Sequence, residues 1–343
     1  MRVIRIGAGE DERRWDDYVG ARTATVADLP GWRRVLEEAY GLRTWTLAAV
    51  EGDRLVGGLG LCESRHHVFG RTLTTAPFFC NAGGLYFDDA AARDALLAEA
   101  KAVADRLGSD SLLVRTMEPR LEGFLLDGRY RTAVIDLSGG AEAVWNRVLR
   151  AKTRNQVRKG MNEGFSVETG PGQLGAFFDV FHEHMRDLGS PAHSRRFYES
   201  IARNLGDRSE FYVVRDGRDL VAGALLFWVN GTAMNLHTVA LHEYNPRCPN
   251  YLLYWKMIEA SCARGCTRFD LGRSEADGPN LAFKEHWGAR PLPLCYNYYL
   301  PKGGDLPYVD PRNPRYRLPI EIWRRLPVAF TKRLGPSLVA GLP

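Results

Sequence analysis

The sequence predicts a mixed α/β fold in which one unit of helices and strands is written twice. A β-hairpin pattern occurs once in each half, with turns at 51–53 and 215–217. The segment EGDRLVGG of the first hairpin closely matches DGRDLVAG of the second. At 343 residues the chain is about two domains long. We therefore expect two mixed α/β units that meet near residue 138.

The first half begins with a helical segment at 29–41, and the hairpin pattern and further strand follow at 45–78. The segment 88–108 is rich in good helix formers and starts with two aspartates, Asp88 and Asp89, either of which can cap a helix. The apolar run SLLVRTM at 111–117 predicts the strand that closes this unit.

The second half repeats this order. Helical patterns cover 141–164 and 175–189, and the hairpin pattern with further strand covers 210–241. A helix is expected at 251–266, where Gly265 is a plausible stop, and a strand at 268–274. The predicted domains are 1–138 and 139–301, followed by a tail at 302–343.

The tail differs from the rest of the chain because it is basic, apolar and interrupted by prolines. Two interpretations stay open: a peripheral helix packed on the second domain, or an element that lies on a membrane surface. Pro327 and Pro336 interrupt any long amphipathic helix, which favours packing.

Composition excludes several classes of protein. A formal net charge of +5 is too small for a protein that coats nucleic acid, so anion binding should come from local patches. The six cysteines lack the spacing of a zinc site and are expected to be reduced thiols. The chain opens without an apolar signal segment and holds no apolar run of membrane-spanning length. A cytoplasmic protein without a bound metal is therefore expected.

The segment NRVLRAKTRNQVRKGMNEG, 146–164, carries six cations and reaches its first acidic residue only at Glu163. On one continuous helix, four arginines would form a single stripe: Arg147, Arg150, Arg154 and Arg158. Guanidinium groups bind phosphate and carboxylate in a planar, bidentate way. The stripe is either an anion site or a solvated face whose acidic partners come from elsewhere.

A second polar group lies at 269–300. The expected strand ends at Leu271, a glycine turn leads to Arg273, and Lys284 stands between Phe283 and Trp287. A lysine near a strand end suits a carboxylate, a phosphate or a developing oxyanion. Asp270 either pairs with Arg273 or acts as a base. In the last strand, alternation points Tyr296 and Tyr298 one way and Tyr299 the other.

These two segments together resemble the FemAB family of aminoacyl and acyl transferases. KTRNQVRKGMNEGF and the distal FDLGRS and FKEHWGARPLPLCYNYYL carry the resemblance, which is strongest for the branch associated with exosortase and exopolysaccharide gene clusters. The resemblance implies tandem N-acetyltransferase-like (GNAT) domains. It also implies direct attack of an amine on an activated acyl group, with Lys284 near the donor. It places the basic helix near an anionic substrate through Lys152, Arg154, Asn155 and Arg158.

The acyl donor is left open between aminoacyl-tRNA, acyl-CoA and an acyl-carrier protein, and no tightly bound cofactor is expected. Neither half shows the Q/R-x-x-G-x-G/A loop that cradles the pyrophosphate of acetyl-CoA. No insertion resembles the coiled-coil arm of some tRNA-using family members.

The sequence thus predicts an acyltransferase that forms an amide on a cell-envelope, exopolysaccharide or peptidoglycan-type precursor. Lys284 and Arg273 are the candidates for electrostatic stabilisation, Asp270 for the base, and Asn250 and Tyr298 for positioning the substrate. The acceptor is expected to be a small or lipid-linked anion, and the tail would allow contact with the inner membrane. The alternative is a non-catalytic module that binds an anionic polysaccharide or lipid-linked intermediate.

Overall fold

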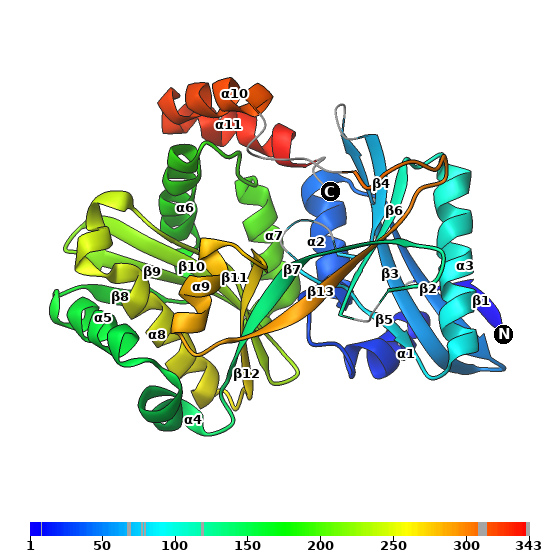
Figure 1. The fold of residues 1–343 in the computed structure, drawn as a ribbon, viewed down its shortest axis with the longest axis horizontal. Helices are drawn as coiled ribbons and strands as arrows, with labels where there is room; N and C mark the ends of the chain where they lie inside the picture. The colour runs from blue at the N-terminus through cyan, green and yellow to red at the C-terminus, as the bar shows by residue number, and fades with distance from the viewer. Residues whose placement is uncertain are drawn as a thin grey trace. The chain divides into compact units, whose positions relative to one another are not determined.

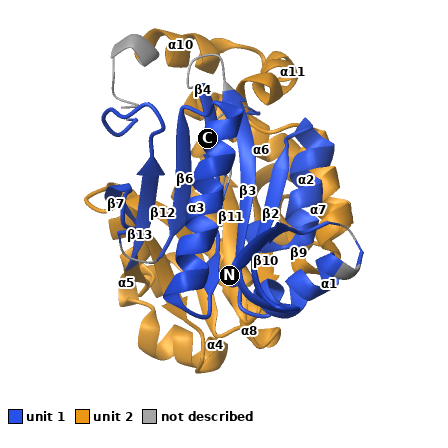
Figure 2. Ribbon diagram, turned by 90° about the vertical axis from the view of Figure 1, so that its right-hand side faces the viewer, with its two compact units in different colours: residues 1–131, 292–307, 340–343 blue, residues 132–291, 308–339 orange. Residues whose placement is uncertain are grey.

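The computed structural model describes residues 1–7, 9–66, 70–76, 78, 80–117, 120–307 and 314–340. The chain forms two compact units, shown in different colours in Figure 2. Unit 1 comprises residues 1–131, 292–307 and 340–343, and unit 2 comprises residues 132–291 and 308–339. The mixed α/β fold predicted from the sequence is confirmed, with helices and strands in both units (Figure 1).

Unit 1 is built on a sheet whose strands run in the order β1-β2-β3-β4-β6-β13, with β5 paired to β3. The pair β4 and β6 is parallel, whereas β13 runs antiparallel to β6. Its strands are β1 (Arg2–Arg5), β2 (Thr44–Glu51), β3 (Arg54–His66), β4 (Gly70–Thr74), β5 (Leu85–Phe87), β6 (Ser111–Thr116) and β13 (Arg290–Tyr299). Its helices are α1 (Glu10–Trp15), α2 (Pro30–Tyr40) and α3 (Ala90–Leu107), with short helical turns at Asp16–Gly20 and Val26–Asp28.

Local chemistry explains the boundaries in unit 1. The Asp89 side chain accepts a hydrogen bond from the Ala92 N–H and starts α3, which ends at the left-handed Gly108. Gly52 has φ 58° in the turn between β2 and β3, a conformation that costs a glycine little. The hairpin and α3 therefore form where the sequence predicts them.

Unit 2 repeats the arrangement, with strand order β7-β12-β11-β10-β9-β8 and a parallel pair formed by β11 and β12. Its strands are β7 (Leu125–Asp136, of which residues 132–136 belong to this unit), β8 (Ser166–Thr169), β9 (Ser209–Asp216), β10 (Asp219–Val229), β11 (Thr232–Ala240) and β12 (Arg268–Glu275). Its helices are α4 (Gly140–Ala143), α5 (Ala151–Asn162), α6 (Leu174–Leu188), α7 (Arg195–Leu205), α8 (Pro249–Ala263), α9 (Pro279–His286), α10 (Pro314–Arg325) and α11 (Val328–Val339). Short helical turns occupy Val144–Val148, Pro171–Gln173, Gly206–Arg208 and His242–Arg247.

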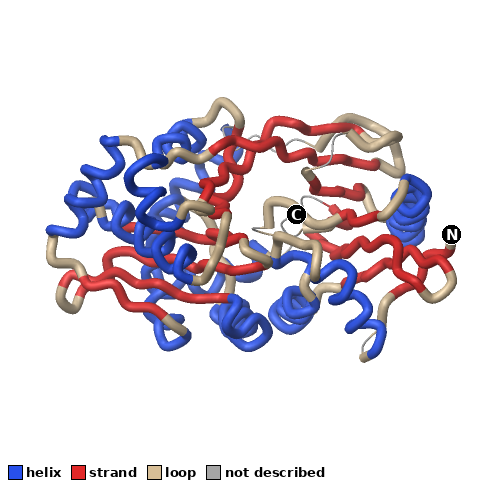
Figure 3. The backbone as a smooth tube through the Cα atoms, turned by 90° about the horizontal axis from the view of Figure 1, so that it is seen from below, coloured by secondary structure: helices blue, strands red, loops and turns tan. Residues whose placement is uncertain are grey.

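Helices cover both faces of the unit 2 sheet (Figure 3). Along β10, Ala222 and Ala224 join the core cluster that contains the apolar residues of α8. Between them, Gly223 lies against Phe177 and Val180 of α6, and a Cβ there would come within 2.8 Å of Val180. A strand buried on both faces explains the nearly continuous apolar sequence of β10.

The two units are not the contiguous segments 1–138 and 139–301 that the sequence predicted. Residues 292–307 of the second predicted segment belong to unit 1, because β13 pairs with β6 through the register Cys295–Thr116 to Tyr299–Leu112. Conversely, β7 follows β6 in the chain but lies beside β12. The last strand of each repeat is therefore exchanged, a pairing that no local pattern encodes.

The helix predicted over 141–164 is broken, so the predicted four-arginine stripe is wrong. A π-helical turn at Val144–Val148 ends at Leu149, and Leu149 and Arg150 adopt extended backbone angles before α5 begins. Leu149 is buried, which fixes the break in the core. Arg147 and Arg150 therefore lie outside the helix that carries Arg154 and Arg158.

The tail packs on unit 2, as the first of the two interpretations predicted. The indole of Trp323 in α10 donates to the Ser190 carbonyl at 3.1 Å. In α11, Lys332 Nζ lies 2.5 Å from Asp179 Oδ1 of α6. In the described part of the chain, every helix is too short or too polar to cross a bilayer.

Candidate active site

Lys284 is held in place by the aromatic packing of its helix. Phe283 in α9 and Trp287, which directly follows α9, pack on Tyr251 and Tyr254 of α8, with ring centroids 5.4 to 6.1 Å apart. The aromatic rings thus anchor α9 to α8 and do not enclose the ammonium group, which points toward β12. Rigid support of this kind fixes the position of a functional side chain.

The Lys284 ammonium group is bound by backbone carbonyls. Nζ donates to the carbonyl oxygens of Gly272 at 2.7 Å and Arg273 at 2.9 Å. The side chain is only 8% exposed, and burial lowers the pKa of Lys284 to about 8, although Asp270 opposes this shift. An ammonium has three N–H donors, so one is left without a partner among the described residues. This free donor can bind an oxyanion or a phosphate oxygen.

Asp270 is on β12, close enough to Lys284 of α9 for the two charges to interact. Thr132 Oγ1 donates to Asp270 Oδ1 at 2.5 Å, and the Gly272 N–H donates to the same oxygen at 2.7 Å. Burial raises the pKa of Asp270, whereas these two hydrogen bonds and Lys284 act in the opposite direction. Oδ2 has no hydrogen-bond partner among the described residues, so it remains available to accept a proton.

Arg273 and Ser274 continue the same strand. The predicted pairing of Asp270 with Arg273 is not formed, because Asp270 accepts from Thr132 and Gly272 instead. Arg273 is exposed and contributes its carbonyl oxygen to Lys284. The Ser274 hydroxyl is buried and has no hydrogen-bond partner among the described residues.

The residues of the basic helix α5 divide into two groups. Arg154 is partly buried and donates to the carbonyl oxygens of Trp145, at 3.2 Å, and Leu149. Its guanidinium therefore caps the break before α5. By contrast, Arg158 is exposed, lies over the Trp145 ring and donates to Asn155 Oδ1 at 3.1 Å. Lys152 and Asn155 are also exposed, so an anion can reach Lys152, Asn155 and Arg158 more easily than Arg154.

α5 is tied to the helix that carries Lys284. Thr153 Oγ1 donates to the His286 carbonyl, at the end of α9, at 2.7 Å. Gly160 allows the close approach of α8, because a Cβ at this position would lie 2.7 Å from the Cys248 carbonyl oxygen. The basic helix and the Lys284 helix are therefore parts of one packed body in unit 2.

Asn250 and Tyr298 lie in different units. Asn250 is in the first turn of α8, and its buried Oδ1 has no partner within the described part of the chain. Tyr298 belongs to unit 1, where it packs beside Leu113 and Tyr296. Tyr299 instead packs against the core cluster that contains α3, so the predicted alternation of these tyrosines is confirmed. Burial raises the pKa of Tyr298.

His182 of α6 and His237 of β11 are buried in the core. Burial lowers the pKa of His182 to about 4 and that of His237 to about 3, so both are neutral at physiological pH. His182 Nε2 lies 2.9 Å from the His193 carbonyl oxygen. Among the described residues, no group of three His, Cys, Asp or Glu side chains has a geometry that could hold a metal ion.

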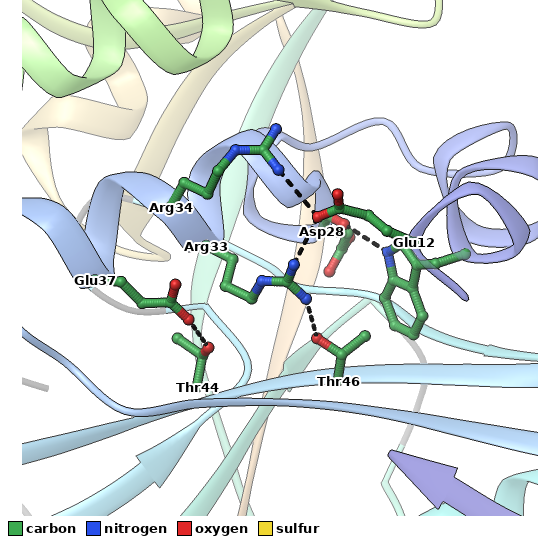
Figure 4. A network of polar contacts seen from close by, with 8 residues as sticks. Glu12, Asp28, Arg33, Arg34, Glu37, Thr44 and Thr46 are labelled. Atoms are coloured by element: carbon green, nitrogen blue, oxygen red, sulfur yellow. Dashed lines mark hydrogen bonds and ion pairs between the residues drawn. The ribbon is translucent and has the colours of Figure 1, made fainter. Parts of the chain in front are cut away.

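Unit 1 contains a separate polar network (Figure 4). Arg33 bridges Glu12 at 2.6 Å and Thr46 at 3.1 Å, and these residues help to line a cavity of about 30 Å³. Such a volume has room for a water molecule or two and not for a substrate. Buried Asp28 beside it accepts from the Gly84 N–H and the Tyr86 hydroxyl. The network thus holds the N-terminal helices on the sheet.

Comparison with known proteins agrees with this fold. Residues 147–285 match the family described as acetyltransferase (GNAT) domain. The structure is similar to that of FemX, with a TM-score of 0.70 and 15% identity over 93% of this chain and 99% of that one. A tandem GNAT protein from the clavulanic acid biosynthesis pathway gives a TM-score of 0.58 and 14% identity, covering 89% and 99% of the two chains.

A third similar structure is the C-terminal domain of a putative lysylphosphatidylglycerol synthetase from Agrobacterium fabrum. Its TM-score is 0.56 and its identity 14%, covering 86% of this chain and 92% of that one. No curated protein matches the chain by sequence. The fold is therefore that of tandem GNAT proteins, and the matching segment supports an acyltransferase, as the sequence predicted.

Proposed function

We propose that this protein transfers an acyl group to an amine, with the reaction centred on Lys284 and Asp270 of unit 2. The observation that carries the proposal is the shared attachment of both side chains to Gly272. The Gly272 carbonyl holds the Lys284 ammonium at 2.7 Å, while the Gly272 N–H holds the Asp270 carboxylate at 2.7 Å. One N–H of Lys284 and one carboxylate oxygen of Asp270 have no hydrogen-bond partner among the described residues.

Amide formation needs both this acceptor and this donor. An acceptor ammonium must lose a proton before its nitrogen can attack the acyl carbon, and Asp270 Oδ2 can take that proton. As the new C–N bond forms, the acyl oxygen gains negative charge, which the remaining Lys284 N–H can stabilise. The tetrahedral intermediate then collapses with cleavage of the bond to the leaving oxygen or sulfur, and the second proton lost by the attacking nitrogen goes to that leaving atom, which gives a neutral amide and an alcohol or thiol.

The acceptor in this proposal is an anionic precursor of the cell envelope or of an exopolysaccharide. The exposed cations Lys152 and Arg158, with the amide of Asn155, would bind its phosphate or carboxylate groups. The FemAB-like sequence motifs and the similarity to FemX support an acceptor of the peptidoglycan or exopolysaccharide type. Similarity to a putative lysylphosphatidylglycerol synthetase adds a lipid headgroup as a class to test.

The experiment offers amino-sugar nucleotide and lipid-linked acceptors in combination with aminoacyl-tRNA, acyl-CoA or acyl-carrier protein, and detects amide product by mass spectrometry. We expect product with one donor class and at least a hundredfold loss of rate in Lys284→Ala, the order of effect expected for removing an oxyanion donor. Lys256→Ala is the matched control, because Lys256 also lies in unit 2 but is half-exposed and pairs with Glu259.

Two other results would redirect the proposal. Full activity in Lys284→Ala would remove this lysine from the reaction centre. Tight acceptor binding without product from any donor class would support the alternative, a non-catalytic module that binds an anionic polysaccharide or lipid-linked intermediate.

A further inference from the structure

The C-terminal helices expose an unusual number of large apolar side chains. Eleven large hydrophobic residues are exposed among the described residues, and five of them lie on α10 and α11. They are Leu318, Ile322, Phe330, Leu334 and Leu338. Leu318 and Ile322 are four residues apart on α10, and the other three repeat every four residues on α11. Such spacing places them along one stripe of each helix.

A second stripe of each helix is fixed to unit 2, on the far side of α10 and one residue further round on α11, and this leaves the apolar stripes exposed. On α11, Thr331, Gly335 and Val339 are buried, and a Cβ at Gly335 would lie 3.0 Å from the Ala192 carbonyl oxygen. On α10, Ile320 lies against Gly189, and Trp323 bonds to the loop after α6. Figure 1 shows both helices lying over the end of α6. We call the exposed side of α10 and α11, which carries these five apolar residues together with Arg325 and Arg333, the outer face.

Cationic side chains flank the apolar stripes. The segment 314–339 holds six basic residues and one acidic residue, Glu321. Its net charge of +5 equals the formal net charge of the whole chain, because the remaining residues contain 40 basic and 40 acidic side chains. Arg325 and Arg333 are exposed, with 84% of the Arg325 side chain accessible, and both lie on the outer face. The segment that carries the exposed apolar residues therefore has an excess of positive charge, whereas the rest of the chain is balanced.

We propose that the outer face of α10 and α11 binds the surface of a membrane rich in anionic phospholipid. Both helices are 12 residues long, about 18 Å at 1.5 Å per residue, so they can lie in the headgroup region and cannot span a bilayer. Apolar side chains gain from entering the acyl boundary, and the arginines gain from the anionic headgroups. A dissolved anionic polysaccharide would satisfy the cations but leave Phe330 and Leu334 in water.

The test is flotation of the full-length protein with vesicles of phosphatidylglycerol mixed with phosphatidylcholine, compared with vesicles of phosphatidylcholine alone. We expect binding to the anionic vesicles that weakens as salt is raised. Leu334→Glu, and separately the pair Arg325→Glu and Arg333→Glu, should each lower the apparent affinity at least about tenfold. Leu125→Glu is the matched control, because Leu125 is 38% exposed in unit 1 and Leu334 is 41% exposed.

Two control measurements test whether a loss of vesicle binding comes from the outer face itself. Circular dichroism melting curves should show that each variant folds. Arg208→Glu with Arg218→Glu, which reverses exposed charges elsewhere in unit 2, should leave vesicle binding unchanged. Binding that disappears in this variant but survives in Leu334→Glu would overturn the proposal. A second result would also overturn the proposal. In this result neither the wild-type protein nor any variant floats with vesicles, and sedimentation velocity shows a wild-type dimer that Leu334→Glu dissociates. The outer face would then be covered by a second copy of the chain.

Discussion

Lys284 Nζ lies 2.7 Å from the Gly272 carbonyl oxygen and is nearly excluded from solvent. Carbonyl oxygens stabilise an ammonium less than bulk water does when the site is otherwise dry, so burial favours the neutral amine. The pKa of Lys284 is consequently lowered to about 8, close to physiological pH. Perturbed groups of this kind concentrate at functional sites.

The first prediction concerns the pH dependence of acyl transfer. If the Lys284 ammonium stabilises the oxyanion, the active charge is present below its pKa of about 8 and is lost above it. The rate should therefore fall as pH rises through about 8. Lys284→Arg keeps the positive charge, because a guanidinium group stays protonated across this pH range, and should move the falling limb to higher pH. Product formation by mass spectrometry across pH 6 to about 10 measures the limb.

A rate that instead rises through this region would contradict electrostatic stabilisation and would identify the neutral amine as a base. The position of the limb is the diagnostic quantity, since Lys284→Arg can also lower the absolute rate by crowding a buried site. Lys256→Arg, on α8, should leave the limb where it is in the wild-type protein.

The second prediction concerns stability. A lysine has a pKa of about 10.4 in the unfolded chain, so between pH 8 and 10.4 the unfolded state binds more protons than the folded state. The free energy of unfolding should therefore rise with pH across this window, by up to about 3 kcal/mol from Lys284 alone. Lys284→Met lacks this contribution, and urea denaturation at both ends of the window measures the difference. An equal pH response in both proteins would contradict the lowered pKa of Lys284.

The third prediction is that Thr132 affects the reaction only through the pKa of Asp270. Its hydroxyl donates to Asp270 and favours the carboxylate, so Thr132→Val should raise the pKa of Asp270 further. If Asp270 is the base, the acidic limb of the rate profile then moves to higher pH while the rate at the optimum changes less. Thr232→Val is the control, because Thr232 is also buried in unit 2, at 7% exposed against 3% for Thr132. An unmoved limb in Thr132→Val would remove Asp270 from the role of base.

Local patterns were sufficient to predict much of the fold. The hairpin turn at Gly52, the cap at Asp89 and the stop near Gly265 all form where sequence chemistry places them. The exchange of β7 and β13 was not predictable, because strand partners far apart in the chain leave no periodic signal. The break at Leu149 was missed for a related reason, since a buried leucine inside a helical pattern does not reveal that tertiary packing ends the helix there.

The same distinction applies to the site. Lys284 and Asp270 could be proposed from the sequence because a lysine and an aspartate near a strand end carry recognisable chemistry, and they stay a prediction. Thr132 was missed, since it lies on another strand, 138 residues earlier, and one threonine in a strand carries no signal. The burial of Asp28, which lies outside the candidate site, was also not predicted, because its contacts with Thr23, Gly84 and Tyr86 depend on the folded chain.

The fourth prediction distinguishes the two arginines of α5. Arg154 caps carbonyl oxygens at the break before the helix, so Arg154→Ala should lower the free energy of unfolding by about 1 to 3 kcal/mol. Arg158 is exposed, so Arg158→Ala should leave stability within about 0.5 kcal/mol and raise the KM for an anionic acceptor. Denaturation and steady-state kinetics on both variants measure the two effects. A change of KM without loss of stability in Arg154→Ala would contradict its assignment as a cap.

The fifth prediction concerns Asp28 in unit 1. Burial raises the pKa of Asp28 to about 6, although Gly84, Thr23 and Tyr86 all donate to its carboxylate. An unfolded aspartate has a pKa of about 3.9, so between pH 4 and 6 the folded state binds more protons and stability falls as pH rises, by up to about 3 kcal/mol. Asp28→Asn does not titrate and should lose this slope, while the exposed Asp207→Asn should retain it. Urea denaturation at about pH 4.5 and pH 6.5 measures this change of the unfolding free energy with pH. If Asp28→Asn shows the same change as the wild-type protein, the Asp28 carboxylate stays ionised in the folded state, where its three hydrogen-bond donors hold it.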